Sequence, residues 1–406
     1  MTATKTKSHG KLWLKILAIV LAVIVILVCA LTVTVSCVWG NEIATAVSLK
    51  QVRVRDDAHE DGSVYTMTVK GGFYFDEFIE QGGVESDSEL ISFITDHITK
   101  GLIDMGLTTS DIACSAFTAQ TQDGDRVFGR NYDFSKTNTC IVYTDAGNGR
   151  HATVSTVDLQ FLGIDGEKDV EGLMDRVTCL AAPFAPLDGM NDAGVSCGIF
   201  MSYQGEETVP TDVKTDKPDI TSTTMLRLIL DYADNVEEAV ELVEKYDLHD
   251  SADTSFHYMV ADATGKSAIL EWTNGTDLTD NDGSKRTLKV IYNDDDAHIG
   301  EREGEADYQW ITNFILQPGY YESDDQKPGV DRYDHIYEQL NATDGIVKDM
   351  DAAMDILASV GRRGWNNDDS NSITVHSVVY NLTDKTAIWI PNEHYDDPDA
   401  RFEIKL

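Results

Sequence analysis

Short segments in which apolar and polar side chains alternate recur from Cys114 almost to the end of the chain. They cover residues 114–121, 126–134, 194–203, 257–265, 267–273, 288–293, 377–382 and 386–391. This two-residue periodicity is typical of β-strands with one buried face. Stretches of helical character lie between them, at residues 223–246, 307–316 and 350–360. The pattern predicts antiparallel sheets packed against helices, an α+β domain.

Composition limits the function classes that fit this chain. It has 406 residues, 42% hydrophobic and 25% charged, which is an ordinary globular balance. The net charge of −38 argues against nucleic acid as a partner, because a strongly negative surface repels phosphates. No pair of cysteines has the C-x-x-C spacing of a metal site, and we expect neither a metal nor a cofactor. The sequence leaves open whether Cys114, Cys140, Cys179 and Cys197 form two disulfides.

The N-terminal region predicts a membrane anchor. Lys5, Lys7, Lys11 and Lys15 precede a stretch without charge from Ile16 to Trp39. We expect residues 1–11 to be cytoplasmic and residues 12–39 to form a single transmembrane helix, with the remainder outside the cell. A cleaved signal peptide is the alternative.

Residues 40–113 are interpreted as a folded leader segment. Residues 63–69 alternate like a strand, and Ser86 with Glu89 has the spacing of a helix capping box. Apolar residues then follow at helical spacing from Leu90 to Leu102. We therefore expect the leader to pack as structure and the catalytic domain to comprise residues 114–406.

Several familiar motifs are not convincing in their context. The G-x-S-x-G pattern at Ser196 follows a turn and precedes a strand, whereas a nucleophile elbow needs a strand, a turn and then a helix. Residues 264–266 resemble part of a P-loop but are interpreted as a hairpin turn. His257, His335 and His376 remain alternative bases for a Cys-His pair, although none has a recognisable signature.

The segment from Cys114 to Phe134 carries the most chemistry. Asp123-Gly124 is interpreted as a two-residue turn, which places Asp133 opposite Cys114 and on the same face. In that register Arg130 pairs with Phe117 and points to the other face unless a bulge intervenes. If the chain is cut before Cys114, the new α-amine, with a pKa of about 7.7 to 8.0, can accept the thiol proton.

These motifs resemble the choloylglycine hydrolase family, which includes bile-salt hydrolases and penicillin V acylases. The resemblance rests on Cys114, on the GRNYD block at residues 129–133 and on the DGMNDAG block at residues 188–194. It continues through LKVIYND at residues 288–294 and GVDRYD at residues 329–334, to the final strand pair.

The resemblance implies a four-layer αββα fold of the N-terminal-nucleophile hydrolases. It implies hydrolysis of linear amides of N-acyl compounds by Cys114, exposed by self-cleavage. The expected catalytic residues are Cys114, Arg130, Asp133, Asn293 and Arg332, with Asn293 in the oxyanion hole. Asn191 and Met201 are expected at the substrate.

Three departures from the family pattern limit what the resemblance implies. Met201 stands where bile-salt hydrolases carry an Asn and penicillin V acylases a Tyr. The stretch between Asn293 and Arg332 is shorter than the one bile-salt hydrolases use for tetramer assembly. The sequence therefore leaves open whether the protein forms a homo-oligomer. The long leader instead resembles the segment that related lysosomal amidases remove by self-cleavage. An acyltransferase of the same fold and an inactive surface binding protein are the alternatives.

Overall fold

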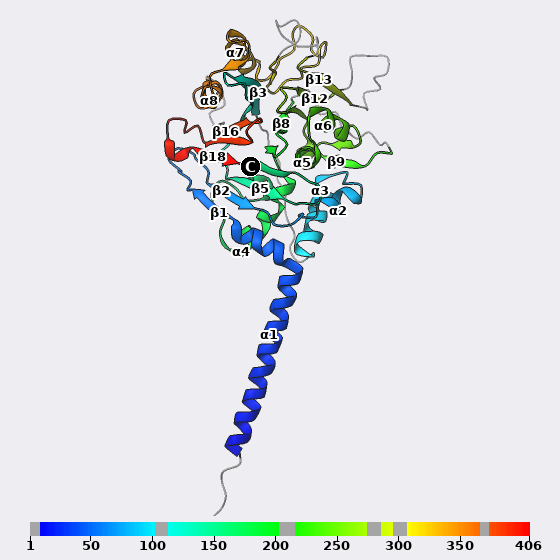
Figure 1. The fold of residues 1–406 in the computed structure, drawn as a ribbon, viewed down its shortest axis with the longest axis vertical. Coiled ribbons are helices and arrows are strands. Elements are labelled where there is room, and N and C mark those ends of the chain that lie inside the picture. Colours follow the sequence, from blue (N-terminus) through cyan, green and yellow to red (C-terminus); the bar gives the residue numbers. More distant parts are fainter. Residues whose placement is uncertain (1–8, 102–112, 203–215, 274–285, 295–306, 366–372) are drawn as a thin grey trace, which may run out of the picture.

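The computed structural model describes residues 9–101, 113–202, 216–273, 286–294, 307–365 and 373–406. Figure 1 shows a head built from sheets and helices, from which α1 (His9–Ser48) extends; α1 has a kink at Trp39, where φ is −127° and ψ is 25°. Lys5, Lys7 and Leu102 lie outside the described residues.

The larger sheet of the described chain has nine strands. Their order is β1-β2-β5-β6-β7-β8-β11-β12-β13. The bounds are β1 Lys50–Arg53, β2 Val64–Thr68, β5 Thr139–Asp145, β6 Ala152–Asp158, β7 Asp188–Asn191, β8 Ser196–Met201, β11 Phe256–Ala261, β12 Ser267–Thr273 and β13 Thr287–Tyr292. All neighbours are antiparallel except β2 and β5, which run parallel.

The second large sheet carries Cys114. Its order is β14-β3-β4-β16-β17-β18, and β15 pairs with β3 in parallel. The bounds are β3 Ala113–Thr121, β4 Arg126–Phe134, β14 Trp310–Ile311, β15 Ile346–Val347, β16 Ile373–Asn381, β17 Thr386–Pro391 and β18 Phe402–Lys405. A small parallel pair, β9 (Asp219–Thr221) and β10 (Asp247–His249), stands apart from both sheets.

Helices cover the outer faces of the two large sheets. The α-helices after α1 are α2 Phe75–Glu80, α3 Asp87–Ile94, α4 Gly172–Thr178, α5 Ser222–Tyr232, α6 Val236–Val243, α7 Val330–Ala342 and α8 Met350–Ser359. Short helical turns are η1 Thr95–Thr99, η2 Leu159–Leu162, η3 Cys179–Phe184, η4 Ser251–Asp253 and η5 Pro398–Ala400. Helices α5 and α6 pack on the nine-stranded sheet, and α7 and α8 pack on the second sheet.

The two large sheets face each other through their inner side chains. Tyr132 of β4 donates from its hydroxyl to Asp158 of β6 at 2.7 Å, and Trp389 of β17 donates to Thr156 of β6 at 3.2 Å. Helix, sheet, sheet and helix therefore follow one another, which is the layered α+β arrangement that the sequence predicted.

The leader is built into this core. β2 pairs with β5 from Val64↔Thr139 to Thr68↔Tyr143, so leader residues extend the larger sheet. Met67, Phe75 and Phe78 are buried in the hydrophobic core. At α3, the Ser86 hydroxyl accepts from the Glu89 amide at 3.3 Å, so Ser86 is the N-cap as expected, but the Glu89 carboxylate accepts from the Glu85 amide at 3.0 Å instead of completing the capping box at Ser86. Removing this segment would expose an apolar face of the sheet.

The expected transmembrane span at residues 12–39 is not supported. Within the described chain, no helix combines the length and apolar character that crossing a membrane requires.

The β3–β4 hairpin forms as predicted, but its register differs by one residue. Cys114 lies opposite Tyr132, and Asp133 lies opposite Ala113. The cause is the loop: the Thr121 amide donates to Asp125 O, which leaves residues 122–124 in the turn, and Gly124 has φ 95°. This is a three-residue hairpin with a left-handed last residue, and not the expected two-residue turn.

The expected helix at residues 307–316 is also wrong. Trp310 and Ile311 form the edge strand β14, paired with Phe117 and Ala116 of β3. Residues 308–314 are all buried, so no polar face remains to reveal the strand period. The turn expected at residues 264–266 is confirmed, since the Gly265 amide donates to Asp262 O at 3.1 Å.

Candidate active site

The Cys114 thiol faces the interior between the two sheets, together with an arginine. In the observed register Ala116 lies opposite Arg130, so Cys114, Arg130 and Tyr132 share the inner face. Nη2 of Arg130 donates to the Cys114 sulfur at 3.4 Å. The expectation that Arg130 points away from the thiol is therefore wrong, and the register of the hairpin explains why.

The Arg130 guanidinium is held by the opposing sheet. Its Nη1 donates to Asp188 of β7, and its Nη2 donates to Ile199 O of β8 at 2.8 Å. Gly198 makes room for the side chain, because a Cβ at this position would lie 2.9 Å from Arg130 Cδ. A glycine within a strand that allows such a close approach has a structural reason to be there.

A second group of side chains surrounds the backbone of Cys114. Oδ1 of Asn313 accepts from the Cys114 amide at 3.1 Å. Arg332 of α7 donates from Nη1 to Cys114 O at 3.1 Å and to Asp133 Oδ2 at 2.9 Å, and from Nη2 to Asn313 Oδ1 at 2.8 Å. Thr374 of β16 donates to the other oxygen of Asp133 at 2.7 Å. The Arg332–Asp133 ion pair is buried, so it orients the groups beside the Cys114 nitrogen.

The thiol is protonated in this form of the chain. Burial raises the pKa of Cys114 to about 11, and the positive charge of Arg130 only partly opposes this shift. Cys114 is fully buried, and its nitrogen is a peptide amide that donates to Asn313, so this nitrogen is not itself a base. A free α-amine at this position would supply a base where none now exists.

Two residues expected at the site, Asn293 and Asn191, hydrogen-bond at turns. Asn293 closes the β11–β12 turn: its Oδ1 accepts from the Ser267 amide and its Nδ2 donates to Gly265 O, both at 3.0 Å. Asn191 similarly closes the β7–β8 turn and holds α5 by donating to Leu230 O and Ala233 O. Both amides thus fix the backbone at turns of the nine-stranded sheet.

Met201 contributes its backbone and not its side chain. Asn313 Nδ2 donates to Met201 O at 2.9 Å. The neighbouring Phe200 ring faces Arg130 at 5.3 Å, so by strand alternation the Met201 side chain points to the opposite face of β8.

The alternative nucleophiles and bases have structural roles. Ser196 lies within β8 and donates to Gly189 O at 2.7 Å, which excludes the strand–turn–helix geometry of an elbow. Among described residues, His257 bonds to Glu271 and Thr312 O, and His376 bonds to Asp188. The His335 ring packs against Trp365. The histidines thus support neighbouring groups.

Asn313 is the residue that sequence reasoning missed. It lies in an apolar run that was interpreted as a helix, and its amide is buried with three hydrogen-bond partners. A buried amide among apolar neighbours must be paired, and that requirement is the only sequence signal for its role.

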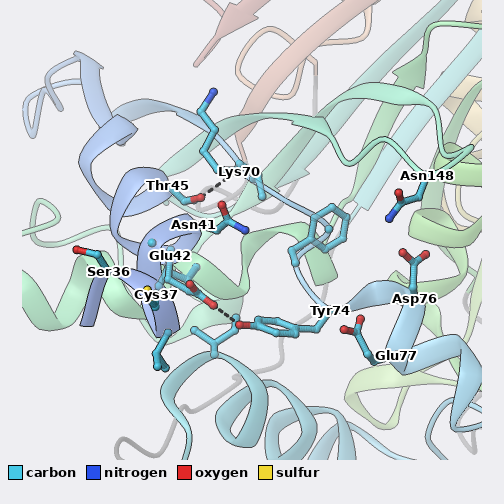
Figure 2. A pocket seen from close by; sticks show the side chains of 17 residues that line it. Ser36, Cys37, Asn41, Glu42, Thr45, Lys70, Tyr74, Asp76, Glu77 and Asn148 are labelled. Carbon is cyan, nitrogen blue, oxygen red and sulfur yellow. Dashed lines mark hydrogen bonds between the residues drawn. The ribbon is translucent and has the colours of Figure 1, made fainter. Parts of the chain in front are cut away.

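A cavity of about 440 Å³ is lined by residues other than those around Cys114. Figure 2 shows Glu42 of α1 reaching Tyr74, with Asp76 and Glu77 of α2 on the far side. The cavity is lined by the C-terminal part of α1, by leader residues, and by Asn148 and Leu180; Cys114 is not among its lining residues.

Comparison with known proteins finds similarity in the segment that starts at Cys114. Residues 114–286 match the model of the linear amide C-N hydrolases, choloylglycine hydrolase family. The bile salt hydrolase/transferase of Clostridium perfringens (strain 13 / Type A) is 26% identical over 176 residues, which is 39% of this chain and 48% of that protein. The match confirms the resemblance expected from the Cys114 motifs, although it spans only about half the length of this relative.

Solved structures that resemble this chain have TM-scores below 0.5. A mutant conjugated bile acid hydrolase from Clostridium perfringens has a TM-score of 0.46 at 15% identity, covering 72% of this chain and 92% of that one. Penicillin V acylase from Agrobacterium tumefaciens gives 0.42 at 17% identity, covering 68% and 83%. The Caenorhabditis elegans N-acylethanolamine-hydrolyzing acid amidase ortholog gives 0.41 at 17% identity, covering 66% and 93%. At these TM-scores the likeness carries no argument, and the fold class rests on the layers described above.

Proposed function

Because residues 114–286 match the choloylglycine hydrolase family of linear amide C-N hydrolases, we propose that this chain hydrolyses the amide bond of N-acyl compounds. Cys114 is the nucleophile, and it acts as an N-terminal residue of an N-terminal-nucleophile fold. The observation that carries the proposal is the arrangement around Cys114, with Arg130 on the sulfur and Asp133, Arg332 and Asn313 around its backbone.

The first step of the proposal is self-cleavage at the bond between Ala113 and Cys114. The Cys114 sulfur attacks the Ala113 carbonyl carbon, the C–N bond breaks, and the nitrogen takes a proton to become the α-amine. Water then hydrolyses the thioester, which releases the Ala113 carboxylate and restores the thiol.

Turnover repeats the same chemistry on an external amide. The α-amine takes the thiol proton, and the thiolate attacks the substrate carbonyl. The amine part leaves with a proton, and water resolves the acyl thioester to a free acid. Asp133 and Asn313 orient the amine, Arg332 fixes both of them, and Arg130 stabilises the thiolate.

The test is hydrolysis by the purified chain of glycine- and taurine-conjugated bile salts, penicillin V and simple N-acyl amides. We expect release of the free acid from at least one of them by wild-type protein and none by Cys114→Ser. A chain that is correctly cut yet inactive on the whole panel would contradict the proposal.

Acyl transfer is the second candidate, because the Clostridium perfringens relative is named both a hydrolase and a transferase. In that case an amine resolves the thioester in place of water. Products formed with an amino acid added at millimolar concentration separate the two reactions, since transfer yields a new amide and hydrolysis yields only acid.

We also propose that the catalytic domain lies outside the cell, held at the membrane through its N-terminal region. The support comes from the sequence alone: lysines precede Ile16, and no charged residue follows until Glu42. Protease added to intact cells is expected to digest the domain, and complete protection would reject this location.

A further inference from the structure

A buried carboxylate on the opposing sheet holds the guanidinium that touches the Cys114 sulfur. Oδ2 of Asp188 accepts from Nη1 of Arg130 and, at 2.8 Å, from Nε2 of His376. Its Oδ1 accepts from the Tyr380 hydroxyl at 2.7 Å. Asp188, Arg130 and His376 are all 0% exposed. Three donors from two strands of the second sheet thus converge on one side chain of the first.

The charges in this cluster balance. Although burial disfavours its ionised form, the pKa of the Asp188 carboxyl is held well below its usual range by the Arg130 guanidinium and by the hydrogen bonds that His376 and Tyr380 donate to it. Burial lowers the pKa of His376, so at neutral pH the ring is neutral and donates from Nε2. Its Nδ1 has no hydrogen-bond partner among the described residues, as expected for an unprotonated nitrogen. Asp188 is therefore the anion that faces Arg130.

Few other contacts fix the position of Arg130. Besides Asp188 and the sulfur, its guanidinium hydrogen-bonds only to Ile199 O in the described chain, and its Nε has no partner there. The rings of Phe200 and Tyr132 lie 5.3 and 5.5 Å from the guanidinium carbon. A buried arginine without its carboxylate would lose its charge-assisted anchor and turn toward other acceptors.

We propose that Asp188, supported by His376, is a positioning residue that aims Arg130 at the Cys114 sulfur. The inference rests on the proposed function of Cys114 as a nucleophile. Neither Asp188 nor His376 touches Cys114, so both act through Arg130. The stacking of the His376 ring against Trp389, at 5.3 Å between centroids, keeps its donor in line with Asp188.

The test is a double-mutant cycle between Asp188→Asn and Arg130→Lys. Two quantities are measured for each variant: kcat with KM on the best amide substrate, and the rate of Cys114 alkylation by iodoacetamide, followed on the Cys114 peptide by mass spectrometry. Asp188→Asn alone is expected to lower kcat roughly 100-fold, as for a catalytic group displaced by about 1 Å, with little change in KM. In the Arg130→Lys background it should add no further loss, in either quantity.

The matched control is Asp231→Asn. Asp231 is also a buried carboxylate paired with arginines, at 2.6 Å to Arg150 and 3.0 Å to Arg227, but it contacts neither Arg130 nor Cys114. Its effect is expected to be small and to multiply with that of Arg130→Lys. If Asp188→Asn does not fold, His376→Phe keeps the ring packing and removes the donor. His376→Phe should lower the Cys114 alkylation rate and kcat in the wild-type background, and it should lower neither in the Arg130→Lys background.

The proposal would be overturned if the effects of Asp188→Asn and Arg130→Lys multiply. It would also be overturned if folded Asp188→Asn and His376→Phe keep the wild-type alkylation rate and kcat. Alkylation keeps this outcome separate from the proposed function. If wild-type protein hydrolyses no amide, the hydrolase assignment fails, while the alkylation cycle still decides whether Asp188 acts through Arg130.

Discussion

Arg130 and Arg332 contact different atoms of Cys114. Arg130 approaches the sulfur from the inner face of β4, whereas Arg332 reaches the carbonyl oxygen from α7 and pairs with Asp133. Sequence reasoning selected all of these residues through the family motifs. It selected Asn293, which follows a strand as the motif requires and hydrogen-bonds at the β11–β12 turn, and it did not select Asn313, which lies in a buried run without local signal.

We expect Asn313→Ala to lower turnover by roughly 100-fold, because the α-amine loses the acceptor that orients it. Self-cleavage should slow as well, since the same oxygen accepts from the scissile amide. Asn293→Ala is the matched control, and its turnover should stay within about threefold of wild type after correction for folded protein, as for a loss outside the oxyanion hole. Steady-state kinetics on cut protein measure both. A larger loss for Asn293→Ala than for Asn313→Ala would contradict the assignment.

In the β3–β4 hairpin, the alternation of apolar and polar residues predicted the two strands but not the register between them. The two strands were predicted close to their observed bounds: β4 agrees at residues 126–134, whereas β3 begins one residue earlier than predicted, at Ala113. The register of the two strands was not predicted correctly, because a DG pair fits both two- and three-residue loops. One added loop residue shifts every cross-strand pair by one residue. Residues 307–316 show the converse case, in which burial on all sides removes the periodicity that separates strand from helix.

Gly124→Ala tests the observed loop. Gly124 has φ 95°, and a Cβ there meets nothing closer than Gln120 Nε2 at 3.7 Å, so the cost is backbone strain alone. We expect a loss of about 1 kcal/mol and a fall of about 2 °C in Tm. Gly364 is exposed without a positive φ, and Gly364→Ala should change Tm less. Equal Tm values for the two variants in thermal denaturation would argue against the left-handed turn.

In the whole molecule, the leader and the catalytic domain share one sheet. Residues 50–99 include strands and helices, but no sequence pattern indicated that β2 would pair with β5 in parallel. Long-range pairing of this kind depends on partners far apart in the chain, which local periodicity does not report.

The shared sheet predicts that the leader stays bound after self-cleavage. Met67 is 1% exposed, and Met67→Lys should release the leader, because a buried lysine costs more than about 3 kcal/mol. Val54 is 66% exposed, and Val54→Lys should leave the two chains together. Gel filtration followed by denaturing electrophoresis gives the answer. A wild-type leader that separates without denaturant would show that the sheet does not hold the pieces together.

The central claim, that Cys114 works as an N-terminal nucleophile, is tested most directly by the intact mass and N-terminal sequence of purified, active protein. The account predicts two chains, one of which begins at Cys114, and a single uncut chain for Cys114→Ala. Wild-type protein that remains one chain and still hydrolyses amides would contradict it.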